Sequence, residues 1–184
     1  MPSPCPTPPF SRTSRGWRVK ADKVYLVGFM GAGKTTASRA LGKRLDWKVE
    51  DIDARIESAE RRDIPTIFRQ DGEPYFRSRE RQVLVGLLPE RGVVVGSGGG
   101  TFSDPANREL MLNDGAVVWL DAPFATILAR IPLDGRRPLA ADRLEMEQLY
   151  NQRRAAYRQA HLRVDAGRGS VEELVDHIVD WLNT

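Results

Sequence analysis

The sequence is poor in the residues that build disulfide frameworks, metal centres and membrane spans. It has one cysteine and two histidines in 184 residues. No apolar run approaches the ~20 residues that a membrane-spanning helix needs. The single cysteine, Cys5, cannot form an internal disulfide or a cysteine-based metal site. The chain is long enough for one domain with its own hydrophobic core. Because it lacks a disulfide framework and a candidate membrane span, we expect a cytoplasmic protein with no membrane partner.

Acidic residues are missing from residues 1–20, and this absence explains the basic character of the whole chain. The segment carries Arg12, Arg15, Arg18 and Lys20. Subtracting these four positive charges from the net charge of +3 leaves −1 for the remaining residues. The folded part is therefore close to neutral, and we expect no nucleic-acid partner. The leader is also rich in proline, which predicts a disordered extension, with a short targeting peptide as the alternative.

A glycine-rich phosphate-binding motif is the most informative feature of the chain. Residues 28–35 fit the pattern G-x-x-x-x-G-K-[ST] and read Gly28-Phe29-Met30-Gly31-Ala32-Gly33-Lys34-Thr35. An apolar run at 23–27 precedes the motif and a helical pattern at 36–45 follows it, which is the strand–loop–helix context that the motif requires. The backbone N–H groups of such a loop and the positive end of the helix favour phosphate oxygens. Lys34 can reach the β- and γ-phosphates, and the Thr35 hydroxyl can ligate Mg²⁺.

Apolar runs alternate with helical patterns along the rest of the chain. The predicted strands are 23–27, 47–50, 93–95, 116–120 and 162–164. The predicted helices are 36–45, a helical stretch over 54–90 that is broken near Pro65 and at Asp71-Gly72, helices that begin at Asp104-Pro105 and at Pro123, a helix at 143–159, and a closing helix at 171–182 with a capping box formed by Ser170 and Glu173. This alternation predicts a parallel sheet covered on both faces.

Polar clusters follow three of the predicted strands, where an open α/β sheet binds its ligands. The phosphate loop follows the first strand, Asp51 and Asp53 follow the second, and Gly98–Gly100 follow the third. If the chain is extended at 51–53, the two aspartates point to opposite sides, one towards a Mg²⁺–phosphate site and one towards a substrate. On spacing alone, a pair of solvated loop carboxylates is an equally good interpretation.

Arginines are distributed unevenly, and many lie in or near predicted loops and helix ends. They could neutralise a migrating phosphoryl group or clamp an anionic acceptor, although most surface arginines are only solvated. The loop at 131–142 carries Arg136-Arg137-Pro138 and is predicted to be a mobile lid that brings charge to the site on closure. The other arginines in such positions are Arg77, Arg130, Arg153, Arg154, Arg158 and Arg168.

Taken in order, these motifs resemble the shikimate kinase family over roughly residues 22–183. The matching elements are the phosphate loop, Asp51-Ile52-Asp53, Ile67-Phe68 leading to Asp71-Gly72-Glu73, Phe76-Arg77-Ser78-Arg79-Glu80, Gly98-Gly99-Gly100, Arg130, Arg136-Arg137-Pro138-Leu139 and Tyr157-Arg158. The resemblance implies a P-loop NTPase fold, an adenylate-kinase-like α/β/α sandwich with a five-stranded parallel sheet and a mobile lid. It implies ATP-dependent phosphorylation of the 3-hydroxyl of shikimate, a step towards chorismate, by a single kinase domain at 21–184. Within that domain, residues 54–90 would bind the substrate and 131–142 would form the lid.

The resemblance also implies roles for individual residues. The catalytic residues would be Lys34, Asp53 and Arg137. The nucleotide would be bound by Gly31, Ala32, Gly33, Lys34, Thr35, Thr36, Arg130, Arg137 and Arg168. The acceptor would be bound by Asp53, Arg77, Gly99, Gly100 and Arg158, with Glu80 orienting Arg77. Mg²⁺ would be held by Thr35 and Asp51.

Two other functions stay open from the sequence. A kinase for another small hydroxy acid, such as gluconate, would share the phosphate loop and the general fold. A nucleotide-binding regulator without turnover would share the loop alone. We expect a monomer whose partners are its small-molecule substrates, ATP and shikimate.

Overall fold

The structure is a computed structural model, and it describes residues 11–12, 18–19, 21–131 and 143–184. The core is a five-stranded, wholly parallel sheet with the order β4-β5-β3-β6-β7. Its strands are β3 (Lys23–Val27), β4 (Lys48–Asp51), β5 (Val93–Gly96), β6 (Ala116–Asp121) and β7 (Leu162–Asp165). All five predicted strands are confirmed. A separate antiparallel pair, β1 (Ser11–Arg12) and β2 (Arg18–Val19), lies in the leader, whose predicted disorder stays a prediction.

Helices connect the strands in the predicted alternation. They are α1 (Lys34–Leu45), α2 (Ile52–Glu60), α3 (Ile64–Leu87), a short 3₁₀ helix η1 (Thr101–Ser103), α4 (Pro105–Asp114), α5 (Phe124–Arg130), α6 (Arg143–Tyr157) and α7 (Val171–Asn183). The break predicted near Pro65 falls earlier, between α2 and α3, because proline is tolerated in the first turn of a helix. The break at Gly72 is confirmed, since Gly72 has φ 80° and ψ 173° inside α3. The capping box at the start of α7 is also confirmed.

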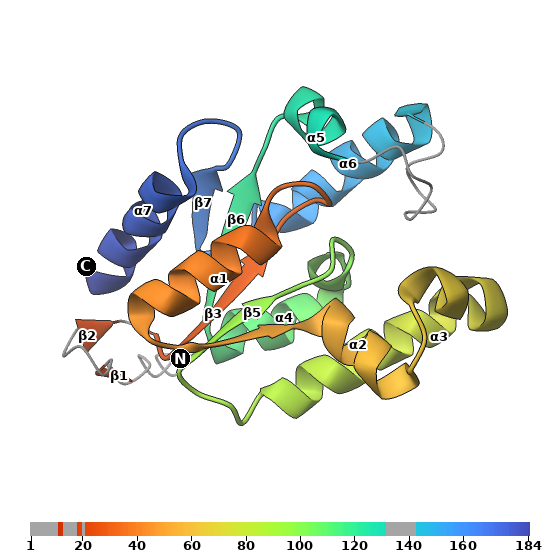
Figure 1. Cartoon of the computed structure of the whole chain (residues 1–184), viewed down its shortest axis with the longest axis horizontal. Coiled ribbons are helices and arrows are strands. Elements are labelled where there is room, and N and C mark those ends of the chain that lie inside the picture. Colours follow the sequence, from red (N-terminus) through yellow and green to blue (C-terminus); the bar gives the residue numbers. More distant parts are fainter. Residues whose placement is uncertain (1–10, 13–17, 20, 132–142) are drawn as a thin grey trace, which may run out of the picture.

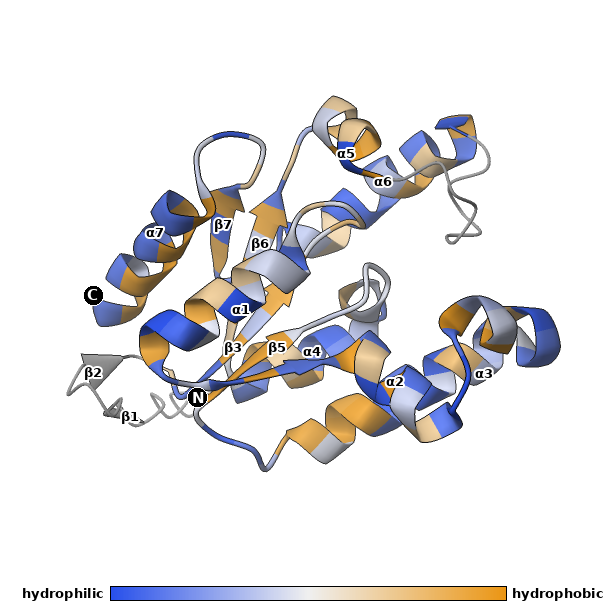
Figure 2. Ribbon diagram, in the orientation of Figure 1, coloured by the Kyte–Doolittle hydropathy of each residue, from blue (hydrophilic) through white to orange (hydrophobic). Residues whose placement is uncertain are grey.

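The helices cover both faces of the sheet, so the chain has three layers (Figure 1). α1 and α7 pack against each other on one face, and α4 lies on the opposite face. The central strands β3, β5 and β6 have every residue buried. They are mostly hydrophobic, as expected for strands buried on both sides (Figure 2), and their charged residues, Lys23 and Asp121, lie at strand ends. No helix in the described part of the chain is long and apolar enough to cross a lipid bilayer.

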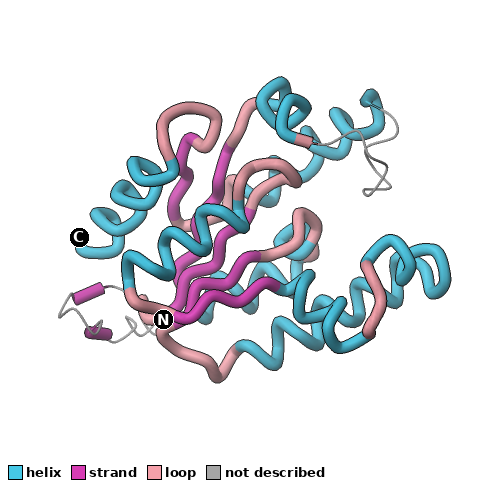
Figure 3. Tube along the Cα trace, in the orientation of Figure 1, coloured by secondary structure: helices cyan, strands magenta, loops and turns pink. Residues whose placement is uncertain are grey.

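The loops that follow β3 and β5 gather at one edge of the sheet, where the strands end (Figure 3). The first of these loops starts with Gly28, which has φ 145°. A β-carbon on Gly28 would lie 2.6 Å from the carbonyl oxygen of Leu120, at the end of the neighbouring strand β6. Only glycine fits this close approach, and it sets the phosphate loop directly against the sheet.

A buried ion pair fixes the opposite end of β3. Lys23 is fully buried, and its Nζ lies 2.6 Å from Asp114 Oδ2 and 2.8 Å from the Leu87 carbonyl oxygen. Tyr25 donates a second hydrogen bond to the same Asp114 oxygen, at 2.5 Å. Burial lowers the pKa of Lys23, while Asp114 acts in the opposite direction. The pair therefore joins the strand that leads into the phosphate loop to the ends of α3 and α4.

Removing Asp114 should leave the Lys23 charge buried without its carboxylate partner. We expect Asp114→Ala to lower the free energy of unfolding by about 3–5 kcal/mol, the usual cost of breaking a buried pair. Urea unfolding measures the effect. Asp176→Ala is the control, because it removes a 3.4 Å pair with Arg44 that is largely exposed, and it should cost under about 1 kcal/mol. Equal losses of unfolding free energy in the two variants would contradict the conclusion that the buried Lys23–Asp114 pair stabilises the fold.

Candidate active site

The phosphate loop, residues 28–33, joins β3 to α1 and has the geometry of an anion-binding turn. Gly31 and Gly33 have positive φ values of 76° and 94°. Helix α1 starts directly after Gly33, which brings its positive end to the loop. Lys34 Nζ lies 2.9 Å from the carbonyl oxygens of Gly28 and Phe29, so the ammonium group lies across the loop. The loop is therefore shaped to surround a phosphate group with donors and positive charge.

Asp51 and Asp53 both lie at the start of α2, but they do not alternate along a strand. β4 ends at Asp51 and α2 begins at Ile52, so the segment is not extended and the condition for side chains on opposite sides is not met. Asp51 is the N-cap of α2 and accepts a hydrogen bond from the Ala54 backbone at 3.1 Å. Asp53 is in the first helical turn. The chain turns helical because the Asp51 cap stabilises the first turn of α2.

Asp53 is a carboxylate in an unfavourable environment. Its Oδ1 atom is buried and has no hydrogen-bond partner among the described residues. Burial, the negative charges of Glu80 and Asp51, and a smaller effect of Glu57 raise its pKa to about 6, against the opposing effect of Lys34. A buried carboxylate oxygen without a partner is ready to accept a hydrogen bond from a ligand hydroxyl.

The three glycines after β5 bring charged groups from separate elements close together. β-Carbons on Gly98, Gly99 and Gly100 would lie 2.8 Å from Asp53 Oδ1, 3.1 Å from Arg153 Nη1 and 2.5 Å from Arg77 Nη1. The middle glycine also faces the phosphate loop, since its β-carbon would lie 3.4 Å from the Met30 backbone nitrogen. We call residues 98–100 the glycine loop. Its lack of side chains is what allows an aspartate and two arginines to approach the same stretch of backbone.

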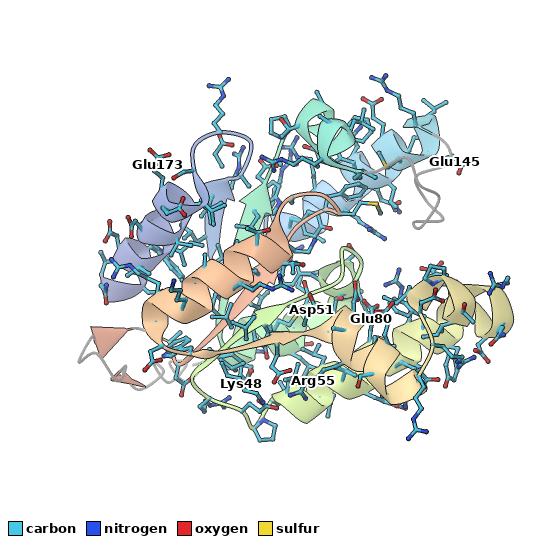
Figure 4. The ribbon with its side chains drawn as sticks, in the orientation of Figure 1. Lys48, Asp51, Arg55, Glu80, Glu145 and Glu173 are labelled. Carbon is cyan, nitrogen blue, oxygen red and sulfur yellow. The ribbon has the colours of Figure 1, made fainter. Side chains whose placement is uncertain are left out.

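Arg77 is held in place by two carboxylates. Its guanidinium group donates to Glu80 at 2.6 Å and to Glu73 at 2.8 Å. Glu80 is fully buried, and its other oxygen accepts a hydrogen bond from the Thr101 hydroxyl at 2.6 Å. Figure 4 shows Asp51 and Glu80 on facing elements near the centre of the molecule. The prediction that Glu80 orients Arg77 is confirmed.

The second arginine at this site is Arg153. Arg158, the predicted partner of Arg77, is exposed and does not line the cavity beside the glycine loop. Arg153 is only 8% exposed and has no ion pair with any residue that the structure describes. Its guanidinium group lies 5.6 Å from the centre of the Phe29 ring, and burial lowers its pKa. The structure therefore places Arg153 where the sequence analysis placed Arg158.

A helical pattern distinguishes the two arginines. The buried residues of α6 are Met146, Tyr150, Arg153 and Tyr157, spaced four, three and four residues apart. This is the spacing of one helix face. Arg158 does not belong to this buried face. The spacing of this buried face would have identified Arg153 in the sequence. It would also have identified Tyr157, whose hydroxyl donates to the Gly99 carbonyl oxygen.

The cavity itself has a volume of about 520 Å³ and lies between α3, the glycine loop and α6. Its lining residues are Glu73, Arg77, Gly100, Ser103, Asp104, Arg108, Leu149, Gln152, Arg153, Ala155, Ala156 and Gln159. Lys34 and Asp53 do not line this cavity. Asp53 approaches the glycine loop at Gly98, and the phosphate loop, which leads into Lys34, approaches it at Gly99. Lys34 and Asp53 interact electrostatically, so the phosphate loop and the acidic residue belong to one charged region.

The predicted adenine-flanking arginines lie at the other side of the phosphate loop. Arg130, at the end of α5, donates a hydrogen bond to the Ala166 carbonyl at 3.0 Å, which ties α5 to the loop that carries Arg168. Both arginines are exposed. Ile131 reaches the phosphate loop, because a β-carbon on Gly31 would lie 3.1 Å from it. Arg137 and nearly all of the predicted lid lie outside the described residues.

The donor set fits Mg²⁺ that arrives with a nucleotide. Thr35 is exposed in the first turn of α1, and Asp51 supplies a carboxylate at the end of β4. No group of three or more His, Cys, Asp or Glu residues in the described ranges could hold a metal ion unaided. Mg²⁺ typically takes one or two protein oxygens and completes its shell with substrate phosphates and water. Thr35 and Asp51 are compatible with such a site.

Comparison with known proteins gives a consistent result. The family model described as shikimate kinase matches residues 30–183. The shikimate kinase of Sulfurihydrogenibium sp. (strain YO3AOP1) is 40% identical over 157 residues, which cover 85% of this chain and 95% of that protein. A solved shikimate kinase from Acinetobacter baumannii in complex with shikimate is 36% identical, with a TM-score of 0.83 over 86% of this chain and 91% of that one. A deoxyadenosine kinase from M. mycoides with bound dATP has a TM-score of 0.62 at 17% identity over 88% of this chain and 99% of that one, which shows the fold alone.

The raised pKa of Asp53 predicts that this carboxylate destabilises the folded protein. A carboxyl group with a pKa of about 6 in the folded state and 3.8 otherwise binds its proton more tightly when folded. The penalty for its charge is therefore full above pH 6 and fades as the pH falls towards 4. We expect Asp53→Asn to raise the free energy of unfolding at pH 8 by on the order of 1–2 kcal/mol, and by less at pH 5.

Urea unfolding at the two pH values measures this effect. Glu109→Gln, on the exposed side of α4, is the control and should show no such gain. A lower free energy of unfolding for Asp53→Asn at pH 8 would show that the carboxylate is a structural group.

Proposed function

This chain belongs to the shikimate kinase family, and we propose on that premise how its site transfers the γ-phosphoryl group of ATP to the 3-hydroxyl of shikimate. The observation that carries the proposal is the arrangement around the glycine loop. Two arginines, Arg77 and Arg153, and the unpartnered carboxylate oxygen of Asp53 all approach its backbone. This arrangement suits a small acid that carries a hydroxyl group.

The phosphate loop binds the triphosphate of ATP. The backbone N–H groups of Gly31, Ala32, Gly33, Lys34, Thr35 and Thr36 contact phosphate oxygens at the positive end of α1. Lys34 exchanges its contacts with the Gly28 and Phe29 carbonyls for the β- and γ-phosphates. Its charge is thus near the group that migrates, where it stabilises the transition state.

Mg²⁺ would be held by Thr35 and Asp51, with Asp51 bonded directly or through water. When bound, the ion would offset the negative charge of the phosphate groups. Asp51 is already fixed as the cap of α2, so its position does not depend on the ligand.

Asp53 orients the acceptor hydroxyl and accepts its hydrogen bond. The unpartnered Oδ1 atom gains a donor when the substrate binds, which relieves part of the cost of burying it. Phosphoryl transfer proceeds through a loose transition state, so the nucleophile needs little activation and positioning dominates. With a pKa of about 6, Asp53 is ionised at neutral pH and able to take the proton as the bond forms.

Arg77 and Arg153 clamp the carboxylate of the substrate. Arg77 is oriented by Glu73 and Glu80, while Arg153 is a buried guanidinium that forms no ion pair in the described structure, although the charges of Glu80 and Glu73 act on it. A substrate carboxylate supplies the missing ion-pair partner. The backbone of Gly99 and Gly100 then contacts the ring, close to both arginines.

The remaining assignments rest on the sequence resemblance. Arg137 reaches the transferring phosphate when the lid at 131–142 closes and excludes water, which would otherwise consume ATP. Arg130 and Arg168 flank the adenine. Residues 21–184 act as one kinase domain with 54–90 as the substrate segment, in a cytoplasmic monomer that binds no nucleic acid.

A coupled assay of ADP release tests the function. Shikimate should give rapid turnover with ATP and Mg²⁺, and gluconate should give none. We expect Lys34→Met to reduce turnover by about 10²-fold or more, the scale of losing an electrostatic stabiliser. ATP that binds tightly but is not consumed with any acid acceptor would favour a regulator instead of an enzyme.

The choice of Arg153 over Arg158 has its own test. Arg153→Ala should raise KM for shikimate by about tenfold or more, because a charge-assisted pair to the carboxylate is lost. Arg158→Ala is the matched control, directly after the end of the same helix, and should change KM by less than about twofold. Steady-state kinetics at saturating ATP measures both. A larger effect from Arg158 would return the role to the residue that the sequence suggested.

A further inference from the structure

The helix that carries Arg77 is broken just before it. Gly72 has φ 80° and ψ 173°, and Pro74 follows, so α3 consists of two helical segments joined at a kink. Continuous helical hydrogen bonds do not pass through this point. The orientation of the second segment, which presents Arg77 and Glu80, must therefore be set by contacts with other elements.

Glu60 makes such contacts from the end of α2. Its carboxylate accepts a hydrogen bond from the Tyr75 hydroxyl at 3.0 Å and lies 2.6 Å from Arg79 Nε. Only 10% of the Glu60 side chain is exposed. We call Glu60, Tyr75 and Arg79 the Glu60 latch. It joins the end of α2 to the first two turns of the second α3 segment.

Arg62 extends the same contacts to the first α3 segment. Its guanidinium group lies 2.7 Å from Glu60 and 2.6 Å from Asp71, the residue before the kink. It also donates to Gln70 at 2.8 Å. The residues on both sides of Gly72 are thus tied to one carboxylate, which fixes the angle between the two segments.

The latch and the substrate clamp use opposite sides of one helical segment. Tyr75 and Arg79 are four residues apart and share a face, whereas Arg77 is two residues from each and faces the other way. Arg77 contacts Glu80 and the glycine loop on that other side. Meanwhile α2 carries Asp53 near its start and Glu60 at its end. The latch is therefore a direct mechanical connection between the helix of Asp53 and the helix of Arg77.

We propose that Glu60 is a positioning residue that sets the distance between the carboxylate clamp at Arg77 and the hydroxyl-binding Asp53. Glu60 does not touch the substrate; it fixes the second α3 segment so that both ends of one small acid are bound at once. This inference rests on the proposed function of the site. Shifts of about 1 Å in a binding group cost heavily in affinity and rate, so the latch acts on substrate binding more than on overall folding.

Kinetics of Glu60→Ala in the full chain tests the proposal. We expect KM for shikimate to rise about three- to tenfold with KM for ATP unchanged. Shikimate binding measured by calorimetry should weaken by the same factor. Arg79→Ala should have a similar effect, and the double variant should be no worse than either single one, because all three lose the same connection. Glu60→Gln, which keeps an acceptor for Tyr75, should recover part of the affinity.

Glu90→Ala provides the matched control. The Glu90 side chain pairs with Arg55 at 2.8 Å and with Lys48 at 3.3 Å. It therefore has a comparable role in surface ion pairs, but only its backbone, and not its side chain, bonds to the second α3 segment, at the Leu87 carbonyl. Thermal unfolding of every variant separates lost stability from lost positioning. KM for shikimate unchanged in a folded Glu60→Ala, or raised equally in Glu90→Ala, overturns the proposal. Failure of the proposed function is distinct, because the wild-type chain would then not turn over shikimate at all.

Discussion

Three missing β-carbons, at Gly98, Gly99 and Gly100, are the constraint on which the rest of the site depends. Each position lies so close to a charged side chain that a methyl group would displace Asp53, Arg153 or Arg77. These three residues belong to α2, α6 and α3, and they lie 24 to 100 positions apart in the sequence. The glycine loop allows them to converge on one piece of backbone at the end of β5. The phosphate loop reaches the same backbone from β3.

Glu80 couples the two halves of the acceptor site electrostatically. Its buried carboxylate holds Arg77 and accepts the Thr101 hydroxyl, which makes the clamp rigid. The same negative charge also repels Asp53 and, after burial, is the largest cause of its raised pKa. Glu80 thus orients Arg77 for the carboxylate of the substrate and raises the pKa of Asp53, which binds its hydroxyl. The charged Asp53 lowers the free energy of unfolding, and the site is formed before the substrate arrives.

Much of this arrangement was predictable from local patterns. The five strands, the phosphate loop, the Gly72 break and the capping box of α7 all depend on residues close together in the chain, and all are confirmed. Two features of direction needed the tertiary structure. Asp51 and Asp53 do not alternate, because the Asp51 cap starts a helix at Ile52. Arg158 does not line the cavity, because the buried face of α6 contains Arg153 and Tyr157 and α6 ends before Arg158.

The sequence by itself determined the class of fold, the position of the phosphate loop and the family, since hydrophobic periodicity and glycine spacing are local signals that survive without any knowledge of packing. The tertiary structure decided which arginine shares the site with Arg77, how Glu80 perturbs Asp53, and that Glu60 ties two helices across a kink. Those features depend on distances between residues that are 15 to 76 positions apart in the chain. Distances of that kind exist only after the sheet has brought the elements together, because Coulomb and hydrogen-bond energies depend on separation in space and not along the chain.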